Sequence, residues 1–299
     1  MNHPIAVIGA PSSIGIRPYD DGEARHLDRA PGVLRRRNLV SRLGALDFGD
    51  VTPPPYRDYA KPADRGRNER EVLSYSRLLA RRVVSVTQSG RFAVVLGGDC
   101  SIVLGCLLAA RKRAGGPVGL VYVDAHADFA TAEDSATGSM SGMALALASG
   151  RGASLLTSLA GPTPLVHDER VVMLGRRSTD SRSGGTALEA SSILELPLTG
   201  FDPIGPDGRA ATTLHRVASS GARGFWIHLD VDVINPAVMH AVDSPVPGGP
   251  GLEDLVRVLK PLVDHPLALG LDVSIYDPAL DPDRSCARRL VGLLETLVH

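Results

Sequence analysis

The feature that most constrains this sequence is a series of short, nearly continuous apolar runs, each followed by a segment of helical periodicity. The runs are rich in β-branched residues and occupy residues 5–9, 92–96, 118–126, 171–175, 225–233 and 267–275. Strands that are apolar on both sides are typical of a parallel sheet whose two faces are both covered by helices. The sequence therefore predicts an α/β protein built on a parallel sheet.

The segments between these runs repeat apolar residues every three or four positions, which predicts helices. The expected helices lie at roughly 69–89, 101–114, 141–149, 252–264 and 284–298. Two stretches rich in Pro and Gly, 50–67 and 244–251, predict surface loops. Because the sequence contains no internal repeat and no linker, we expect residues 1–299 to form one domain.

Composition and charge narrow the classes of partner. The formal net charge is -1 over 299 residues, which provides no basic field for nucleic acid. No run approaches the roughly 18 apolar residues of a membrane span, and the N-terminal residues lack a secretory signal pattern. The three cysteines match no zinc or redox spacing. We therefore expect a cytoplasmic protein that acts on a small molecule, without a nucleic-acid or membrane partner.

Polar motifs follow three of the expected strands. They read GGDCS at 97–101, DAHAD at 124–128 and DVDV at 230–233. In parallel α/β sheets, ligands bind outside the carboxyl ends of the strands. We therefore expect these three motifs to meet at one edge of the sheet.

Two of the motifs place ionisable side chains two positions apart. Side chains of an extended chain alternate with period two, so the members of one motif would share a face. These residues are Asp124, His126 and Asp128 in the first case, and His228, Asp230 and Asp232 in the second. Four carboxylates buried together would each cost several kcal/mol unless a cation neutralised them. Such donors suit two Mn(II), Fe(II) or Zn(II) ions, whereas the alternative is ordinary Asp residues that cap turns beside a satisfied histidine.

With these motifs the chain resembles the ureohydrolase family, which includes arginase, agmatinase and formimidoylglutamase. The similar segments cover nearly the whole chain and include GAPSSIG at 9–15, APGVLRRRNL at 30–39, TGSMSGMALA at 137–146, LDVDVINP at 229–236 and VPGGPG at 246–251. The resemblance implies a three-layer α/β/α fold with a central, mainly parallel sheet. It also implies two divalent ions, ordinarily Mn(II), that share a bridging hydroxide. Family members often form trimers or hexamers, so a homo-oligomer is compatible with the resemblance.

The resemblance also assigns metal ligands. The implied set is Cys100, Asp124, His126, Asp128, Asp230 and Asp232. Asp124 and Asp230 would bridge the ions, and Asp128 would join them on the first ion. His126 and Asp232 would complete the second. Cys100 stands where the family has a histidine ligand of the first ion. A thiolate there would favour Zn(II) or Fe(II) over Mn(II), whereas the alternative is a small buried residue that does not touch the metal.

Other positions depart from the family pattern. Ser141 stands where arginases have a histidine that shuttles protons, and Ile275 stands where a carboxylate would hold the guanidinium group. Phe129 and Ala130 replace a polar pair that grips the amino acid end of arginine. These changes favour a less basic substrate than L-arginine, such as an N-hydroxyguanidine, or alternatively a formimino compound.

The remaining site predictions concern catalysis and substrate binding. Asp128 would accept a hydrogen bond from the attacking hydroxide and help to move its proton. His228 is a candidate proton carrier, or alternatively donates to a backbone group. Asp180 would contact a substrate ammonium group, or alternatively is a solvated turn residue, and Thr137 and Ser141 would line the substrate site.

The sequence thus predicts a two-metal hydrolase that cleaves a C–N bond of a guanidino-like small molecule. One alternative is a metal-binding or regulatory relative without turnover, suggested by Ser141 and Ile275. Another is a deacetylase-like hydrolase with a single zinc ion. The number of ions bound per chain would separate the three hypotheses.

Overall fold

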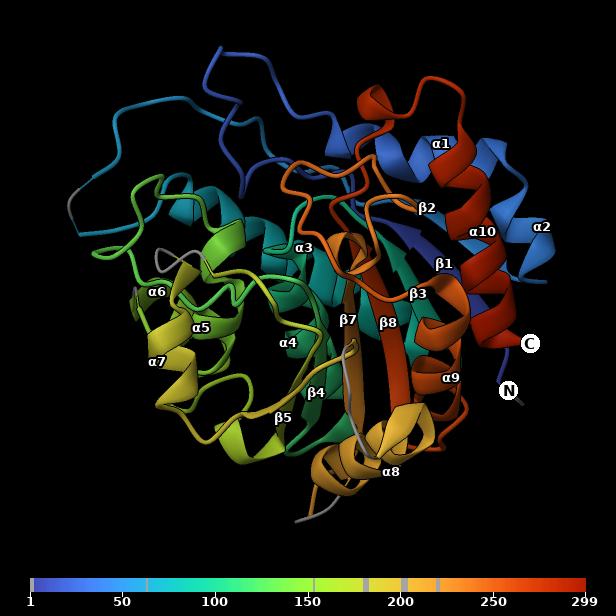
Figure 1. The fold of residues 1–299 in the computed structure, drawn as a ribbon. Helices are drawn as coiled ribbons and strands as arrows, with labels where there is room; N and C mark the ends of the chain where they lie inside the picture. Colours follow the sequence, from blue (N-terminus) through green and yellow to red (C-terminus); the bar gives the residue numbers. More distant parts are fainter. Residues whose placement is uncertain (1–2, 63, 153, 180–182, 200–203, 219–220) are drawn as a thin grey trace.

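Eight parallel strands form one sheet in the order β2-β1-β3-β8-β7-β4-β5-β6, with helices on both faces (Figure 1). The structure is a computed structural model that describes residues 3–62, 64–152, 154–179, 183–199, 204–218 and 221–299. The predicted three-layer α/β/α fold is confirmed, and every strand pairing in the described residues is parallel.

The elements have the following bounds. The strands are β1 (Ile5–Gly9), β2 (Leu46–Asp50), β3 (Phe92–Leu96), β4 (Gly119–Val123), β5 (Val171–Leu174), β6 (Leu194–Leu196), β7 (Phe225–Asp230) and β8 (Ala268–Ser274). The α-helices are α1 (Ala30–Arg36), α2 (Leu39–Arg42), α3 (Glu69–Thr87), α4 (Ile102–Ala114), α5 (Ala144–Ala148), α6 (Ser154–Thr157), α7 (Gly185–Glu189), α8 (Gly205–Ala218), α9 (Leu252–Val263) and α10 (Ser285–Val298).

The six apolar runs correspond to six of these strands, whereas the sequence patterns did not predict β2 and β6. Both unpredicted strands lie at the edges of the sheet. The residues of β2 are mostly exposed, and those of β6 are only partly buried. An edge strand buries less surface, so it does not need the continuous apolar run that identifies a central strand.

The apolar composition of helix α4 matches its buried position in the fold. It packs between α3 and the strands β7 and β8, and its residues from Ile102 to Ala110 are all buried. A helix covered on all sides is apolar all round, as this one is. The opposite face of the sheet carries α8, α9 and α10 (Figure 1). None of the helices in the described ranges combines the length and the apolar character that a membrane crossing requires.

The loop after β3 has a shape that only glycine permits. A Cβ atom on Gly98 would lie 2.4 Å from the carbonyl oxygen of Ser12, and one on Gly97 would lie 2.7 Å from that of Val273. The buried Asp99 fixes this loop by accepting hydrogen bonds from the Ser12 hydroxyl and the Gly15 amide, both at 3.1 Å. The close packing places residue 100 beside the ends of the neighbouring central strands.

Candidate metal centre

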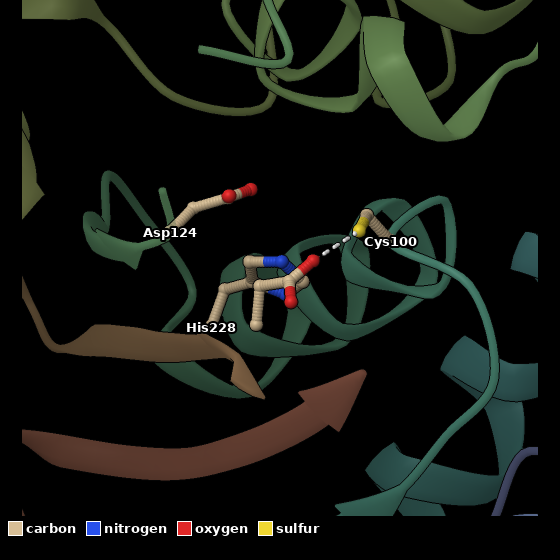
Figure 2. Close-up of side chains that lie close together, drawn as sticks. Cys100, Asp124 and His228 are labelled. Atoms are coloured by element: carbon tan, nitrogen blue, oxygen red, sulfur yellow. Dashed lines mark hydrogen bonds between the residues drawn. The ribbon is translucent and has the colours of Figure 1, made fainter. Parts of the chain in front are cut away.

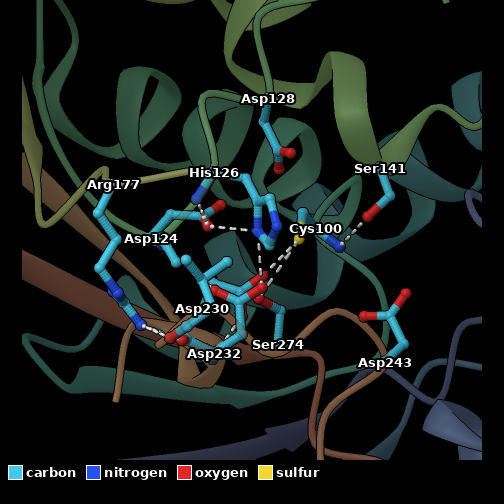
Figure 3. A network of polar contacts seen from close by, with 12 residues as sticks. Cys100, Asp124, His126, Asp128, Ser141, Arg177, Asp230, Asp232, Asp243 and Ser274 are labelled. Atoms are coloured by element: carbon cyan, nitrogen blue, oxygen red, sulfur yellow. Dashed lines mark hydrogen bonds and ion pairs between the residues drawn. The ribbon is translucent and has the colours of Figure 1, made fainter. Parts of the chain in front are cut away.

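Three strand ends bring the predicted ligands together at the carboxyl edge of the sheet (Figure 3). Two groups of donor atoms each lie within 4.8 Å of one another. The first donor group consists of Cys100, Asp124, His228 and Asp230, and the second donor group consists of Asp124, His126 and Asp232. Because Asp124 belongs to both groups, the two sites are adjacent and share a carboxylate.

Hydrogen bonds link the side chains of the first donor group. The Cys100 thiol donates to Asp230 Oδ2 at 3.0 Å, and its sulfur lies 3.7 Å from the hydroxyl of Ser274. The other Asp230 oxygen accepts from the amide of Asp232 at 2.8 Å. The Cys100 amide in turn donates to the Ser141 hydroxyl at 3.2 Å. These contacts place the sulfur among the carboxylates, as the predicted ligand role of Cys100 requires.

The second donor group is centred on His126. Its Nδ1 atom lies 2.9 Å from Asp232 Oδ2 and 3.5 Å from Asp124 Oδ1. The backbone holds both carboxylates, since Asp124 accepts from the His126 amide at 2.6 Å and Asp232 accepts from the Ala125 amide at 3.2 Å. Backbone donors therefore orient this group before any ligand binds.

Asp128 directs its carboxylate toward these groups (Figure 3). It also lines an adjacent cavity. Its Oδ2 atom accepts a hydrogen bond from the buried hydroxyl of Tyr122 at 2.7 Å. Its backbone is left-handed, with φ of 46°, a conformation that Asp adopts more readily than most residues. The two donor groups do not include Asp128, so its ligand role stays a prediction.

Burial of several acids makes the site costly in the absence of a cation. Burial first, and then the charges of neighbouring carboxylates, raise the pKa of Asp124 and Asp230 well above the ordinary value. Burial by itself would lower the pKa of His126, but Asp232 and Asp124 raise it to about 12. Burial and the Asp230 charge likewise raise the pKa of the Cys100 thiol. Without a cation these shifts favour the protonated side chains, whereas a bound divalent cation would favour their ionised forms.

Two buried atoms show that the residues fit metal ions. Among the described residues, neither Asp124 Oδ2 nor His228 Nε2 has a hydrogen-bond partner. A buried acceptor without a partner costs about 1–3 kcal/mol, so such atoms are rare in folded proteins. Both residues belong to the first donor group, and a divalent cation bound there could satisfy both atoms. The donor set of carboxylates, imidazoles and one thiol is chemically suited to transition-metal ions.

A cavity of about 220 Å³ opens above the two groups. Thr137 and Ser141, the predicted substrate-binding residues in the described chain, line this cavity, as does Ile275. Asp180 lies outside the described residues. Phe129 and Ala130 are buried, and the Phe129 ring packs under the guanidinium group of Arg151 at 4.9 Å.

The sequence patterns missed an ion pair on the cavity wall. Arg25 Nε lies 3.1 Å from Asp243 Oδ2, and both side chains are nearly buried. The Arg25 guanidinium group also stacks 4.1 Å from the centroid of the Tyr19 ring. Burial raises the pKa of Asp243, while Arg25 acts against this shift. Both residues lie in loops without a periodic pattern, so no local signal could have identified them.

Comparison with known proteins agrees with this geometry. The arginase family model matches residues 3–299 of the sequence. The chain belongs to the arginase family. It is 30% identical over 304 residues to the arginase of Bacillus subtilis (strain 168), which covers 100% of this chain and 98% of that protein. The solved structure of arginase from Bacillus caldovelox matches with a TM-score of 0.86 and 28% identity over 99% of this chain and 98% of that one.

A more distant structure shares only the fold. Proclavaminate amidino hydrolase from Streptomyces clavuligerus matches with a TM-score of 0.71 and 18% identity, over 99% of this chain and 91% of that one. Family membership confirms the predicted resemblance and the prediction of a hydrolase that acts on non-peptide C–N bonds. Enzymes of this family typically bind two divalent cations, and the two donor groups of this arginase-family protein are suited to hold them.

Proposed function

We propose that this arginase-family protein hydrolyses a guanidino-type C–N bond of a small molecule at a centre of two divalent cations. The observation that carries the proposal is the pair of donor groups that share Asp124 below a cavity. Two cations bound there would lower the pKa of a bound water molecule and supply hydroxide near neutral pH. Cys100, Asp124, Asp128 and Asp230 would hold the first cation, and His126 and Asp232, together with the shared Asp124, would hold the second.

Asp128 is the group best placed to handle protons. It lines the cavity, and the Tyr122 hydroxyl fixes one of its oxygens. In the metal-free protein burial, opposed by that hydrogen bond, raises the pKa of Asp128 to about 6. We infer that Asp128 accepts the proton of the attacking water and returns it to the leaving amine. The water oxygen bonds to the substrate carbon as Asp128 takes the proton, and the C–N bond breaks as Asp128 protonates the amine.

The cavity wall favours an uncharged reacting group. Ile275 lines the cavity with an apolar side chain and has a left-handed backbone, with φ of 68°. A β-branched residue is strained in this conformation, and such strain concentrates at functional sites. No carboxylate stands at this position to pair with a guanidinium cation. An N-hydroxyguanidine is less basic than a guanidine because of its electron-withdrawing oxygen, so it would enter as the neutral form.

Proton donation to the leaving amine also favours the less basic substrate. Ser141 lines the cavity and accepts a hydrogen bond from the Cys100 amide, but a hydroxyl cannot act as a general acid near neutral pH. Asp128 must then protonate the leaving amine without a second general acid, and such an acid typically contributes about 10²–10⁴-fold to the rate. We therefore propose that L-arginine reacts more slowly than its N-hydroxy derivative.

The arginine residues that line the cavity suit an anionic or zwitterionic substrate. Arg17 and Arg25 both line the cavity. Of these two side chains, Asp243 forms an ion pair only with Arg25. Arg17 pairs with Asp20, whose side chain is 88% exposed, and a surface pair of this kind contributes little. A substrate carboxylate could therefore bind near Arg17. Thr137 remains the proposed contact for the polar end of the substrate.

A substrate screen combined with metal counting tests the proposal. The panel is arginine, N-hydroxyarginine, agmatine, guanidinobutyrate and formiminoglutamate, each with Mn(II), Zn(II) or Fe(II). We expect two ions per chain and at least about tenfold higher kcat/KM for N-hydroxyarginine than for arginine. Preferred turnover of formiminoglutamate would replace the guanidino substrate with a formimino compound. One zinc ion per chain would favour a deacetylase-like enzyme, and an absence of bound ions would favour a non-catalytic relative.

A further inference from the structure

We propose that His228 is a ligand of the first cation and that it supplies, from strand β7, the imidazole that is absent at position 100. His228 is completely buried and belongs to the first donor group with Cys100, Asp124 and Asp230 (Figure 2). The inference concerns the cation centre on which the proposed function rests, but it does not depend on turnover.

The spacing of the donor atoms fits a single ion. Ligand atoms at about 2.0–2.3 Å from one cation lie at most about 4.6 Å apart. The four donor atoms of the first group already lie within 4.8 Å of one another. His228 precedes Asp230 by two positions on β7, so both side chains leave the same face of the strand. Only small side-chain shifts would therefore be needed to bind one ion.

The hydrogen bonds of His228 set its tautomer. Its Nδ1 atom lies 2.6 Å from Asp272 Oδ2, and the indole of Trp226 donates to Asp272 Oδ1 at 2.6 Å. An ionised carboxylate only accepts hydrogen bonds, so Nδ1 carries the proton and donates it. The Nε2 atom of the neutral ring then has a free lone pair. A carboxylate that orients a histidine through its distal nitrogen is the usual arrangement of a metal-binding histidine.

Packing fixes the direction in which this lone pair points. His228 stands opposite Asp272 on β8 and opposite Tyr122 on β4 in the strand register. The Tyr122 ring packs against the imidazole with ring centroids 4.3 Å apart. Among the described residues, Nε2 has no hydrogen-bond partner. A cation in the first donor group would provide the missing partner.

This assignment gives the two sites different chemistry. The first donor group offers sulfur, nitrogen and two carboxylates, whereas the second offers one imidazole and carboxylates only. Thiolate and imidazole ligands suit Zn(II), and carboxylate-rich sites suit Mn(II). We therefore expect the first site to select zinc over manganese more strongly than the second. Ligation and proton transfer would use the same Nε2 lone pair, so this role replaces the proton-carrier role predicted from the sequence.

Cobalt titration of the metal-free protein tests the inference. Binding of Co(II) to the site with Cys100 should produce a thiolate-to-cobalt charge-transfer band, and Cys100→Ser should abolish it. We expect His228→Gln to weaken Co(II) binding at this site by at least about 100-fold and to change its ligand-field spectrum. The matched variant His126→Gln should weaken the other site and leave the charge-transfer band in place. Unchanged affinity and spectrum in His228→Gln would overturn the inference.

Two further measurements test the inference even if the His228→Gln variant fails to fold. Asp272→Asn keeps the size of the orienting residue, and we expect it to weaken binding at the first site by about 10–100-fold. X-ray absorption of the wild-type protein with two zinc ions needs no variant. Ligation by His228 and His126 predicts one imidazole per zinc on average, whereas a single imidazole for the two ions would refute it. Binding of two ions with one imidazole would overturn only this inference, while failure to bind ions would overturn the proposed function as well.

Discussion

Replacement of Asp128 by Asn tests whether the ionised carboxylate destabilises the folded protein when no cation is bound. Asp128 is 6% exposed, and burial raises its pKa from 3.8 to about 6. At about 1.4 kcal/mol per pKa unit, this shift corresponds to about 3 kcal/mol. This is the free energy by which the ionised side chain destabilises the folded, metal-free protein. Asparagine has a similar size, carries no charge and tolerates the left-handed backbone at this position.

The direction of the pKa shift determines the pH range over which Asp128 changes the stability of the protein. Because the pKa of Asp128 is higher in the folded than in the unfolded protein, the folded state binds more protons between about pH 4 and pH 6. The stability of the metal-free wild type therefore falls as pH rises through this range, and the contribution is constant above it. Asp128→Asn should be more stable than the wild type by about 3 kcal/mol near pH 7.5 and equally stable near pH 4.

Urea unfolding of the metal-free proteins at these pH values measures the difference. Asp207→Asn is the matched control, because its side chain is 81% exposed and should change the free energy of unfolding by less than about 1 kcal/mol. Each cation at about 100 times its Kd should add about 2.7 kcal/mol to the wild type and less to the variant. A metal-free Asp128→Asn protein that is less stable than the wild type near pH 7.5 would refute the argument.

Four further substitutions test the assignments in the centre. Cys100→His should increase Mn(II) retention after dialysis, and elemental analysis that shows the same metals held with the same affinity would remove the ligand role of the cysteine. Because Asp124 belongs to both donor groups, Asp124→Asn should lose both cations, whereas Asp232→Asn should lose only the second; equal metal content in the two variants would contradict the shared carboxylate. Ser141→His should raise kcat for L-arginine by up to about 10²-fold and change that for N-hydroxyarginine much less, as steady-state kinetics can show; an equal change for both substrates would argue against a missing general acid.

The central strands and the ligand motifs were predictable because their signals are local. A strand buried on both faces must be apolar along its length, so β3, β4, β7 and β8 are visible in the sequence. The order β3-β8-β7-β4 brings GGDCS, DAHAD and DVDV to the same edge of four adjacent strands. The edge strands β2 and β6 carry no such signal, since they bury less surface.

Contacts between distant segments could not be predicted in the same way. The pairing of Arg25 with Asp243 depends on how two aperiodic loops fold over the strand ends. The partner of His228 depends on the register of β7 against β8, which sets Asp272 opposite it. Neither pattern nor composition specifies that register, because several registers would bury equally apolar residues.

The sequence by itself determined the parallel α/β architecture and the residues able to bind cations, because periodicity and side-chain chemistry are properties of short segments. Only the tertiary structure decided how these donors divide into two groups around Asp124, and that the buried His228, whose Nε2 has no hydrogen-bond partner among the described residues, belongs to the first of them. The physical reason is that the direction of a lone pair depends on hydrogen bonds and packing from three neighbouring strands, which come together only when the sheet forms.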